Sequence, residues 1–123
     1  MAEESFVKNR IKSFKFAFKG AWLLLKSEAS IQVQFSIGVL MTIAGFVVGI
    51  TPTEWMFQCL AIGLVLSIEG LNTAVEKLAD FIHPDFHHKI GFIKDIAAGA
   101  VCFAAVIAVI VGLIIYVPYL SEW

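Results

Sequence analysis

The chain has 123 residues, of which 59% are hydrophobic and 15% are charged. An average soluble domain has about 45 to 50% apolar and about 25% charged residues, so this composition excludes an ordinary soluble enzyme. It predicts an all-α membrane protein with one domain over residues 1–123. The formal net charge of −1 says little, but six of the nine basic residues precede residue 27. We expect a membrane partner and no nucleic acid.

Residues 5–27 are predicted to form an amphipathic helix at the membrane surface. Apolar residues recur at helical spacing and lysines form a second stripe beside them: Val7, Ile11, Phe14, Phe18, Trp22 and Leu25, against Lys8, Lys12, Lys15, Lys19 and Lys26. This pattern is typical of a helix in the inner membrane interface, with its lysines near water and anionic headgroups. Such a helix either serves only as an anchor or also forms a wall of a site that is open to lipid and cytosol.

Three apolar stretches are long enough to cross a hydrocarbon core of about 30 Å, which takes about 20 residues. The first, 31–50, has no ionisable side chain, and the third, 96–117, is uncharged. The second, 55–80, follows "TPTE", which we interpret as a turn in which Pro52 breaks the helix. Basic residues occupy the N-terminal segment and the link before the third span, so the positive-inside rule predicts that both are cytoplasmic.

The second span ends in a ladder of polar side chains. Its members, separated by three, four and four residues, share one helical face: Glu69, Asn72, Glu76 and Asp80. At a rise of about 1.5 Å per residue, Glu69 lies about 10 Å deeper than Glu76, which is near the cytoplasmic boundary. A carboxylate in the bilayer costs about 2.5 to 3.5 kcal/mol and usually faces a protein interior or a partner. Polar contacts between helices would explain Glu69 and Asn72. They do not require a ladder into the cytosol, which favours a general base at Glu69.

Other polar residues lie at the same boundary. Glu28, just before the first span, is either an ordinary cap or a ligand that meets Glu76 and holds Mg²⁺ together with phosphate oxygens. Lys94 and Asp95, just before the third span, are either flanking charges or groups that hold a phosphate and a ribose or base edge. The link also contains three histidines, His83, His87 and His88. No cysteine or second ligand cluster accompanies them, which favours a solvated loop over a zinc site.

The motif "EGLNTAVEKLAD", followed by "PDFHHKIGFIKDIAAGAV", resembles the signature region of the prokaryotic diacylglycerol kinase family, whose members include undecaprenol kinases. The resemblance extends over nearly the whole chain. It implies a homotrimeric, multi-pass kinase of the bacterial inner membrane that transfers the γ-phosphoryl of ATP to a lipid hydroxyl. Diacylglycerol and undecaprenol both stay open as the acceptor. The alternatives are a small ion- or proton-coupled transporter that uses Glu69, and a purely structural oligomer.

The resemblance also implies roles for individual residues. Glu69 matches the catalytic base of the family, and Asn72 matches its polar neighbour in the same site. Glu28 and Glu76 match the carboxylates that hold the Mg²⁺ of MgATP. The residues at or near positions that contact nucleotide are Arg10, Asp80, Asp85, His87, Lys94 and Asp95.

The chain departs from the family pattern at positions near this site. Gln32 stands where an arginine is common, and Gly70, inside the motif, replaces a bulkier apolar residue. Three short spans enclose little volume, so we expect sites between protomers. The small residues 97–100 would let the helices approach closely.

Overall fold

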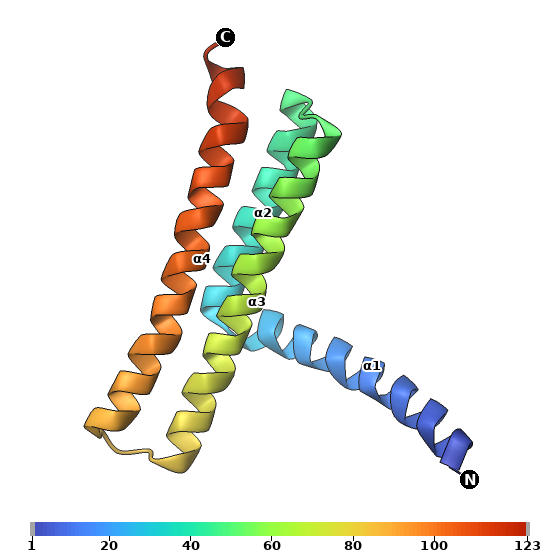
Figure 1. Cartoon of the computed structure of the whole chain (residues 1–123), viewed down its shortest axis with the longest axis vertical. Coiled ribbons are helices and arrows are strands. Elements are labelled where there is room, and N and C mark those ends of the chain that lie inside the picture. The colour runs from blue at the N-terminus through green and yellow to red at the C-terminus, as the bar shows by residue number, and fades with distance from the viewer. Residues whose placement is uncertain (1, 123) are drawn as a thin grey trace.

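The described part of the chain forms four α-helices: α1 (Ala2–Ser27), α2 (Ala29–Val48), α3 (Pro52–Ile82) and α4 (His88–Leu120) (Figure 1). The computed structural model describes residues 2–122. The helices α2, α3 and α4 run beside one another and are each long and apolar enough to cross a membrane, whereas α1 projects away from them. The prediction of an all-α chain with an N-terminal helix and three membrane-length helices is therefore confirmed.

The turn between α2 and α3 lies earlier than predicted, and the interpretation of "TPTE" as a turn is wrong. Gly49 ends α2 in the left-handed conformation, at φ 79°, and α3 begins at Pro52. Proline suits the first helical position, where its missing N–H would have no partner. Thr51 and Glu54 form a capping box: the Thr51 hydroxyl accepts from the Glu54 amide at 3.2 Å, and the Glu54 carboxylate accepts from the Thr51 amide at 2.9 Å. The residues expected to break the helix therefore start it.

The link between α3 and α4 is also shorter than predicted. It covers residues 83–87, and α4 starts at His88. His87 is the N-cap of α4, where its Nδ1 accepts from the Lys89 amide at 3.1 Å. Lys94 and Asp95 consequently lie within the helix rather than in a link before it. Because α4 packs against α3, the positions of Lys94 and Asp95 relative to α3 are set by this packing.

The central helix of the arrangement is α3, which packs against α4 and α2. Two glycines of α2 set its register on α3. A Cβ added to Gly38 would lie 3.0 Å from the Ile62 side chain, and one added to Gly45 would lie 2.6 Å from the Trp55 ring. Each step forward along α2 is thus matched by a step back along α3, as in a closely packed antiparallel pair.

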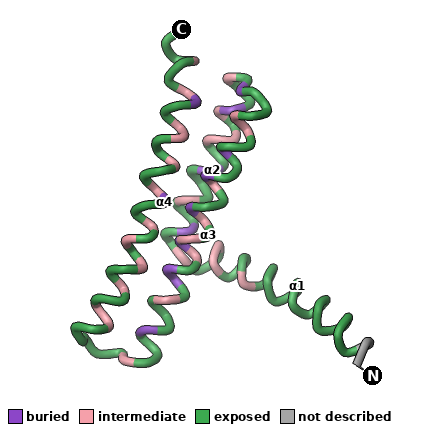
Figure 2. The backbone as a smooth tube through the Cα atoms, in the orientation of Figure 1, coloured by how far each residue is buried: buried purple, intermediate pink, exposed green. Residues whose placement is uncertain are grey.

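A single stripe of α3 is buried (Figure 2). Its members are Gln58, Ala61, Val65, Glu69, Asn72, Thr73 and Ala79. Spacings of three and four residues place such a set on the face that packs against the other helices. Four members are polar, so the interior of the helix group is unusually polar for a chain of this composition.

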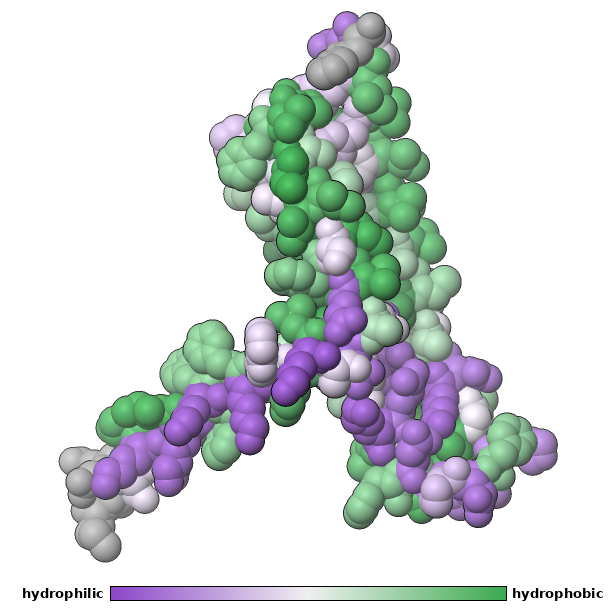
Figure 3. Space-filling view, turned by 180° about the vertical axis from the view of Figure 1, so that it is seen from behind, coloured by the Kyte–Doolittle hydropathy of each residue, from purple (hydrophilic) through white to green (hydrophobic). Residues whose placement is uncertain are grey.

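The outward faces of α2, α3 and α4 are apolar and exposed (Figure 3). Large examples are Phe46, Val47, Leu60 and Phe103, which are 69 to 79% exposed. None of the described residues has a fully buried large side chain. Apolar surface on this scale requires lipid or another protein copy around it.

Candidate active site

Glu69 is the deepest acidic residue of the predicted ladder. It is 7% exposed, and it makes no hydrogen bond or ion pair with any other described residue. The register of α2 on α3 places Ile31, which is buried, level with it. A largely buried acidic residue without a protein partner is costly to keep. Glu69 therefore differs from the paired polar residues of the helix group and remains the predicted general base.

Asn72, one turn further along α3, is also buried and has an unused acceptor. Its Nδ2 donates to Glu76 Oε1 at 3.1 Å. Its Oδ1 is buried and has no hydrogen-bond donor among the described residues. A buried acceptor without a partner costs about 1 to 3 kcal/mol. An ordered water or a ligand would be needed to satisfy this atom.

Glu28 lies between α1 and α2 and reaches α3. Its Oε1 is 3.2 Å from Lys77 Nζ, whereas Glu76 accepts from Asn72. Glu28 therefore contacts the residue that follows Glu76 on α3, and the two predicted metal ligands have different protein partners. No group of three or more His, Cys, Asp or Glu residues that could hold a metal occurs among residues 5–122, whose side chains the structure describes.

The end of the ladder at Asp80 joins α3 to α4. Asp80 Oδ1 lies 2.6 Å from Lys94 Nζ, which brings together two of the residues predicted to contact nucleotide. Asp85 and His87 belong to the link beside them, where His83 Nδ1 lies 2.7 Å from the Asp85 carbonyl oxygen. Hydrophilic side chains gather at this end of the molecule (Figure 3). Asp95 is exposed at the same end of α4.

Arg10 is separated from this group. It lies in the N-terminal half of α1, which projects away from the other helices (Figure 1). Its guanidinium carbon is 5.8 Å from the centroid of the Phe6 ring. Within one chain, the structure does not bring Arg10 to the other predicted nucleotide residues.

The end of α1 covers α3 next to Glu69, a contact that the sequence analysis did not predict. A Cβ added to Gly70 would lie 3.1 Å from Leu24 Cδ1, so the absence of a side chain at Gly70 makes room for Leu24. Gln32 secures the same end of α1, because its Nε2 donates to the carbonyl oxygens of Leu25 at 3.0 Å and Lys26 at 3.2 Å. Both departures from the family pattern are therefore used to hold α1 against the bundle.

A second polar cluster, also missed, lies at the opposite end of α3. Gln58 donates from Nε2 to the Met41 carbonyl oxygen at 2.9 Å. The Tyr116 hydroxyl contacts Gln58 Oε1 at 2.6 Å and the same carbonyl oxygen at 3.2 Å. Extending the ladder backward from Glu69 at spacings of four, four and three residues reaches Gln58. That periodicity is the signal that could have found it.

Comparison with known proteins decides the family. The family model described as prokaryotic diacylglycerol kinase matches residues 15–116. The chain belongs to the prokaryotic diacylglycerol kinase family. The expectation of a lipid kinase is thereby confirmed at the level of this family, and the transporter alternative gains no support.

The relatives of this chain include proteins named undecaprenol kinase and proteins named diacylglycerol kinase. An undecaprenol kinase of Bacillus subtilis is 41% identical over 109 residues, which cover 89% of this chain and 89% of the relative. A diacylglycerol kinase of Synechocystis sp. is 32% identical over 111 residues, which cover 89% of this chain and 63% of the relative. A diacylglycerol kinase of Escherichia coli K12 is 27% identical over 103 residues, which cover 81% and 82%.

Proposed function

We propose that this chain transfers the γ-phosphoryl group of MgATP to the hydroxyl group of a membrane lipid, and that undecaprenol is its acceptor. The observation that carries the proposal is Glu69, a buried carboxylate without a partner on the helix that joins the apolar bundle to the polar end. This location suits a reaction between a membrane alcohol and a water-soluble nucleotide. Neither reactant has to leave its own phase.

The chemistry assigned to Glu69 is the removal of a proton. Its carboxylate accepts the proton of the lipid hydroxyl as that oxygen attacks the γ-phosphorus, and the bond from this phosphorus to the bridging oxygen breaks to release ADP. Asn72 orients the reacting groups through its free Oδ1, while its Nδ2 stays on Glu76. Phosphoryl transfer depends mainly on such positioning and on stabilisation of charge.

Mg²⁺ would be held by Glu28 and Glu76 together with oxygens of the nucleotide. The donor set fits this ion, because Mg²⁺ prefers one or two carboxylates plus phosphate and water oxygens over an all-protein cage. The free Oδ1 of Asn72, beside Glu76, supports a site that a ligand completes. Bound Mg²⁺ would neutralise charge on the phosphates. Glu28 would then exchange Lys77 for the metal.

The nucleotide is assigned to the polar end of the molecule, at Asp80, Asp85, His87, Lys94 and Asp95. Lys94 is a suitable phosphate ligand because it is a cation already fixed at this end by Asp80. Arg10 belongs to the assignment only if α1 of a neighbouring copy supplies it. The separation of Arg10 from the other residues supports sites between protomers, and the family resemblance implies that the assembly is a homotrimer.

The proposed membrane arrangement has α1 in the inner interface and the N-terminus in the cytoplasm. Its support is the angle at which α1 leaves the bundle and the separation of hydrophilic from hydrophobic side chains along it (Figure 3). The polar end formed by α3 and α4 then faces the cytoplasm. The membrane that the three long helices cross is assigned as the bacterial inner membrane.

The preference for undecaprenol rests on the 41% identity to the Bacillus subtilis undecaprenol kinase, which spans 89% of both chains. The test supplies purified protein in mixed micelles with radiolabelled ATP and equal amounts of undecaprenol and diacylglycerol. We expect label in undecaprenyl phosphate, and none after Mg²⁺ is removed with EDTA. Preferential labelling of phosphatidic acid would reverse the choice of acceptor, and label in neither lipid would refute the kinase proposal.

A further inference from the structure

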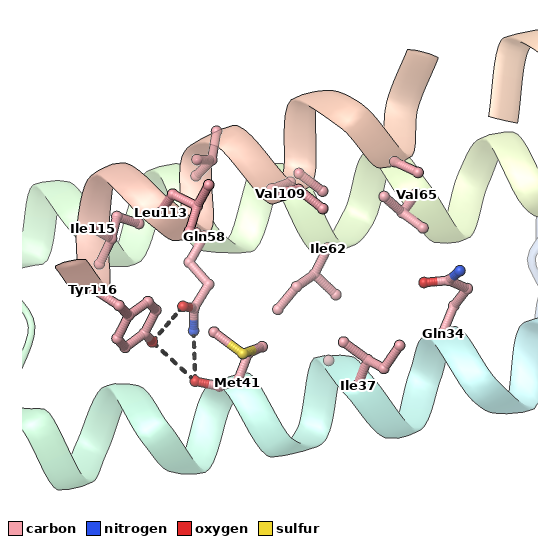
Figure 4. Close-up of a pocket in the computed structure, with 16 residues that line it drawn as sticks. Gln34, Ile37, Met41, Gln58, Ile62, Val65, Val109, Leu113, Ile115 and Tyr116 are labelled. Carbon is pink, nitrogen blue, oxygen red and sulfur yellow. Dashed lines mark hydrogen bonds between the residues drawn. The ribbon is translucent and has the colours of Figure 1, made fainter. Parts of the chain in front are cut away.

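An apolar cavity of about 500 Å³ lies between α2, α3 and α4 (Figure 4). Its volume is within the range of about 300 to 1,000 Å³ that is typical of small-molecule sites. The cavity exists because small residues line it on all three helices: Gly38, Ala61, Ala105, Ala108 and Gly112. None of the roles assigned above uses this space.

One end of the cavity adjoins the candidate active site. Val65, which lines the cavity, is one helical turn from Glu69 on the same buried stripe of α3. Gln34 lines this end from α2, and the register places it level with Leu66. Its amide makes no hydrogen bond with another described residue. The end of the cavity near Glu69 is therefore polar.

The other end is lined by the second polar cluster. Gln58, Tyr116 and the Met41 carbonyl oxygen lie together there and are joined by hydrogen bonds (Figure 4). The side-chain groups at this end are thus paired within the chain and need no partner from a ligand or a second copy. The cavity lining between the two polar ends is apolar.

With Glu76 at the membrane boundary, as expected from the sequence, the cavity extends past the middle of the membrane. Along α3, Glu69 is about 10 Å deeper than Glu76, and Gln58 is about 16 Å further, because each residue rises about 1.5 Å. Together these steps span most of a hydrocarbon core of about 30 Å. A chain that starts from a hydroxyl at Glu69 and fills the cavity must therefore enter the far leaflet.

We propose that this cavity holds the hydrocarbon chain of the lipid acceptor and that it selects a long polyprenyl chain, threaded past the midplane. The inference rests on the proposed function, since it extends the site at Glu69. The chain moves from lipid into protein, so burial from water adds no driving force. The cavity therefore acts through shape, and its effect is discrimination between chains of different length.

The test is a variant that fills the cavity. A Cβ added to Gly112 meets nothing within 4 Å, so Gly112→Leu projects into the cavity without a backbone clash. Gly63 has equally open space but does not line the cavity, which makes Gly63→Leu the matched control. We expect Gly112→Leu to lower the ratio of kcat/KM for undecaprenol to kcat/KM for the short alcohol farnesol by about tenfold. Gly63→Leu should leave this ratio unchanged. An unchanged ratio in Gly112→Leu overturns the inference.

A labelling experiment locates the chain directly. A long polyprenol with a photoactivatable diazirine at its far end is irradiated with the protein, and the labelled peptides are mapped by mass spectrometry. We expect label at Met41, Gln58 or Tyr116, reduced in Gly112→Leu. Label only on the outward faces of the helices refutes the cavity site, even if undecaprenol is phosphorylated normally. A loss of oligomer in Gly112→Leu alone would assign the cavity to a second copy and also refute it. Failure to phosphorylate any lipid alcohol counts instead against the proposed function.

Discussion

Glu69→Gln is expected to stabilise the protein while it abolishes most of its activity. Glutamine has nearly the same shape as glutamate but carries no charge. Glu69 is 7% exposed and has no hydrogen-bond or ion-pair partner among the described residues, so the substitution breaks no contact. It removes the cost of holding an acid inside the membrane, which is about 2.5 to 3.5 kcal/mol at the bilayer centre. Because Glu69 lies nearer the boundary, we expect the free energy of unfolding to rise by about 1 to 2 kcal/mol.

The activity of the same variant should fall steeply. Loss of a positioned general base typically costs about 10² to 10⁴ in rate, which corresponds to about 3 to 5 kcal/mol of barrier. The assay measures kcat with radiolabelled ATP and undecaprenol in mixed micelles. The free energy of unfolding is followed by tryptophan fluorescence in the same detergent.

The matched control is an acid at the opposite end of α3. Glu54 closes the capping box with Thr51 and accepts a hydrogen bond from Tyr119. Glu54→Ala should therefore lower the free energy of unfolding by about 0.5 to 2 kcal/mol, as expected for a lost cap, with little change in kcat. Opposite signs at two acids of one helix separate a catalytic carboxylate from a structural one. If Glu69→Gln loses stability and keeps its turnover, Glu69 is a packing residue and the base must be sought elsewhere.

Three further substitutions test the neighbouring contacts. Glu28→Ala should raise the Mg²⁺ concentration for half-maximal activity about tenfold or more. Lys77→Met removes only the ion-pair partner of Glu28 and should leave this Mg²⁺ concentration unchanged. If both substitutions raised it equally, Glu28 would be only a salt-bridge residue. Lys94→Met should raise KM for ATP about tenfold or more. The free energy of unfolding should change by less than about 1 kcal/mol, because the ion pair between Lys94 and Asp80 is partly exposed. An unchanged KM would remove Lys94 from the nucleotide site. Gly70→Leu should displace the Leu24 side chain and lower kcat, and Leu24→Ala in the same chain should restore part of the loss; no recovery in the double variant would refute steric conflict as the cause.

The ladder on α3 could be predicted from the sequence because helical geometry alone fixes it. Spacings of three and four residues place Glu69 and Asn72 on one face whatever surrounds them, and both are buried in the structure. The same reasoning could not assign partners. Glu28 contacts Lys77 and not Glu76, because side-chain pairing between α2 and α3 depends on the packing register, which no local pattern encodes.

Helix ends were harder to predict than helix faces. Pro52 was interpreted as a breaker, although it occupies the first helical position behind the Thr51 cap. His87 caps α4 through Nδ1, a role that composition does not indicate. Gly70 had no explanation in sequence, because its neighbour Leu24 lies in another helix. Local rules locate elements well, whereas contacts between elements require the fold.

The two polar clusters of α3 differ in a way that indicates their use. At the far end, Gln58 is paired through both its amide nitrogen and its amide oxygen, as expected of groups that only hold helices together. Toward the end of α3 that meets the link to α4, Glu69 lacks any partner among the described residues and Asn72 has one free buried acceptor. The same helix can satisfy its buried polar groups, so the unsatisfied ones are not a failure of packing. Both are acceptors that a donor such as a lipid hydroxyl, or a metal ion, could complete, and this supports the proposed assignment of the kinase reaction to this end of α3.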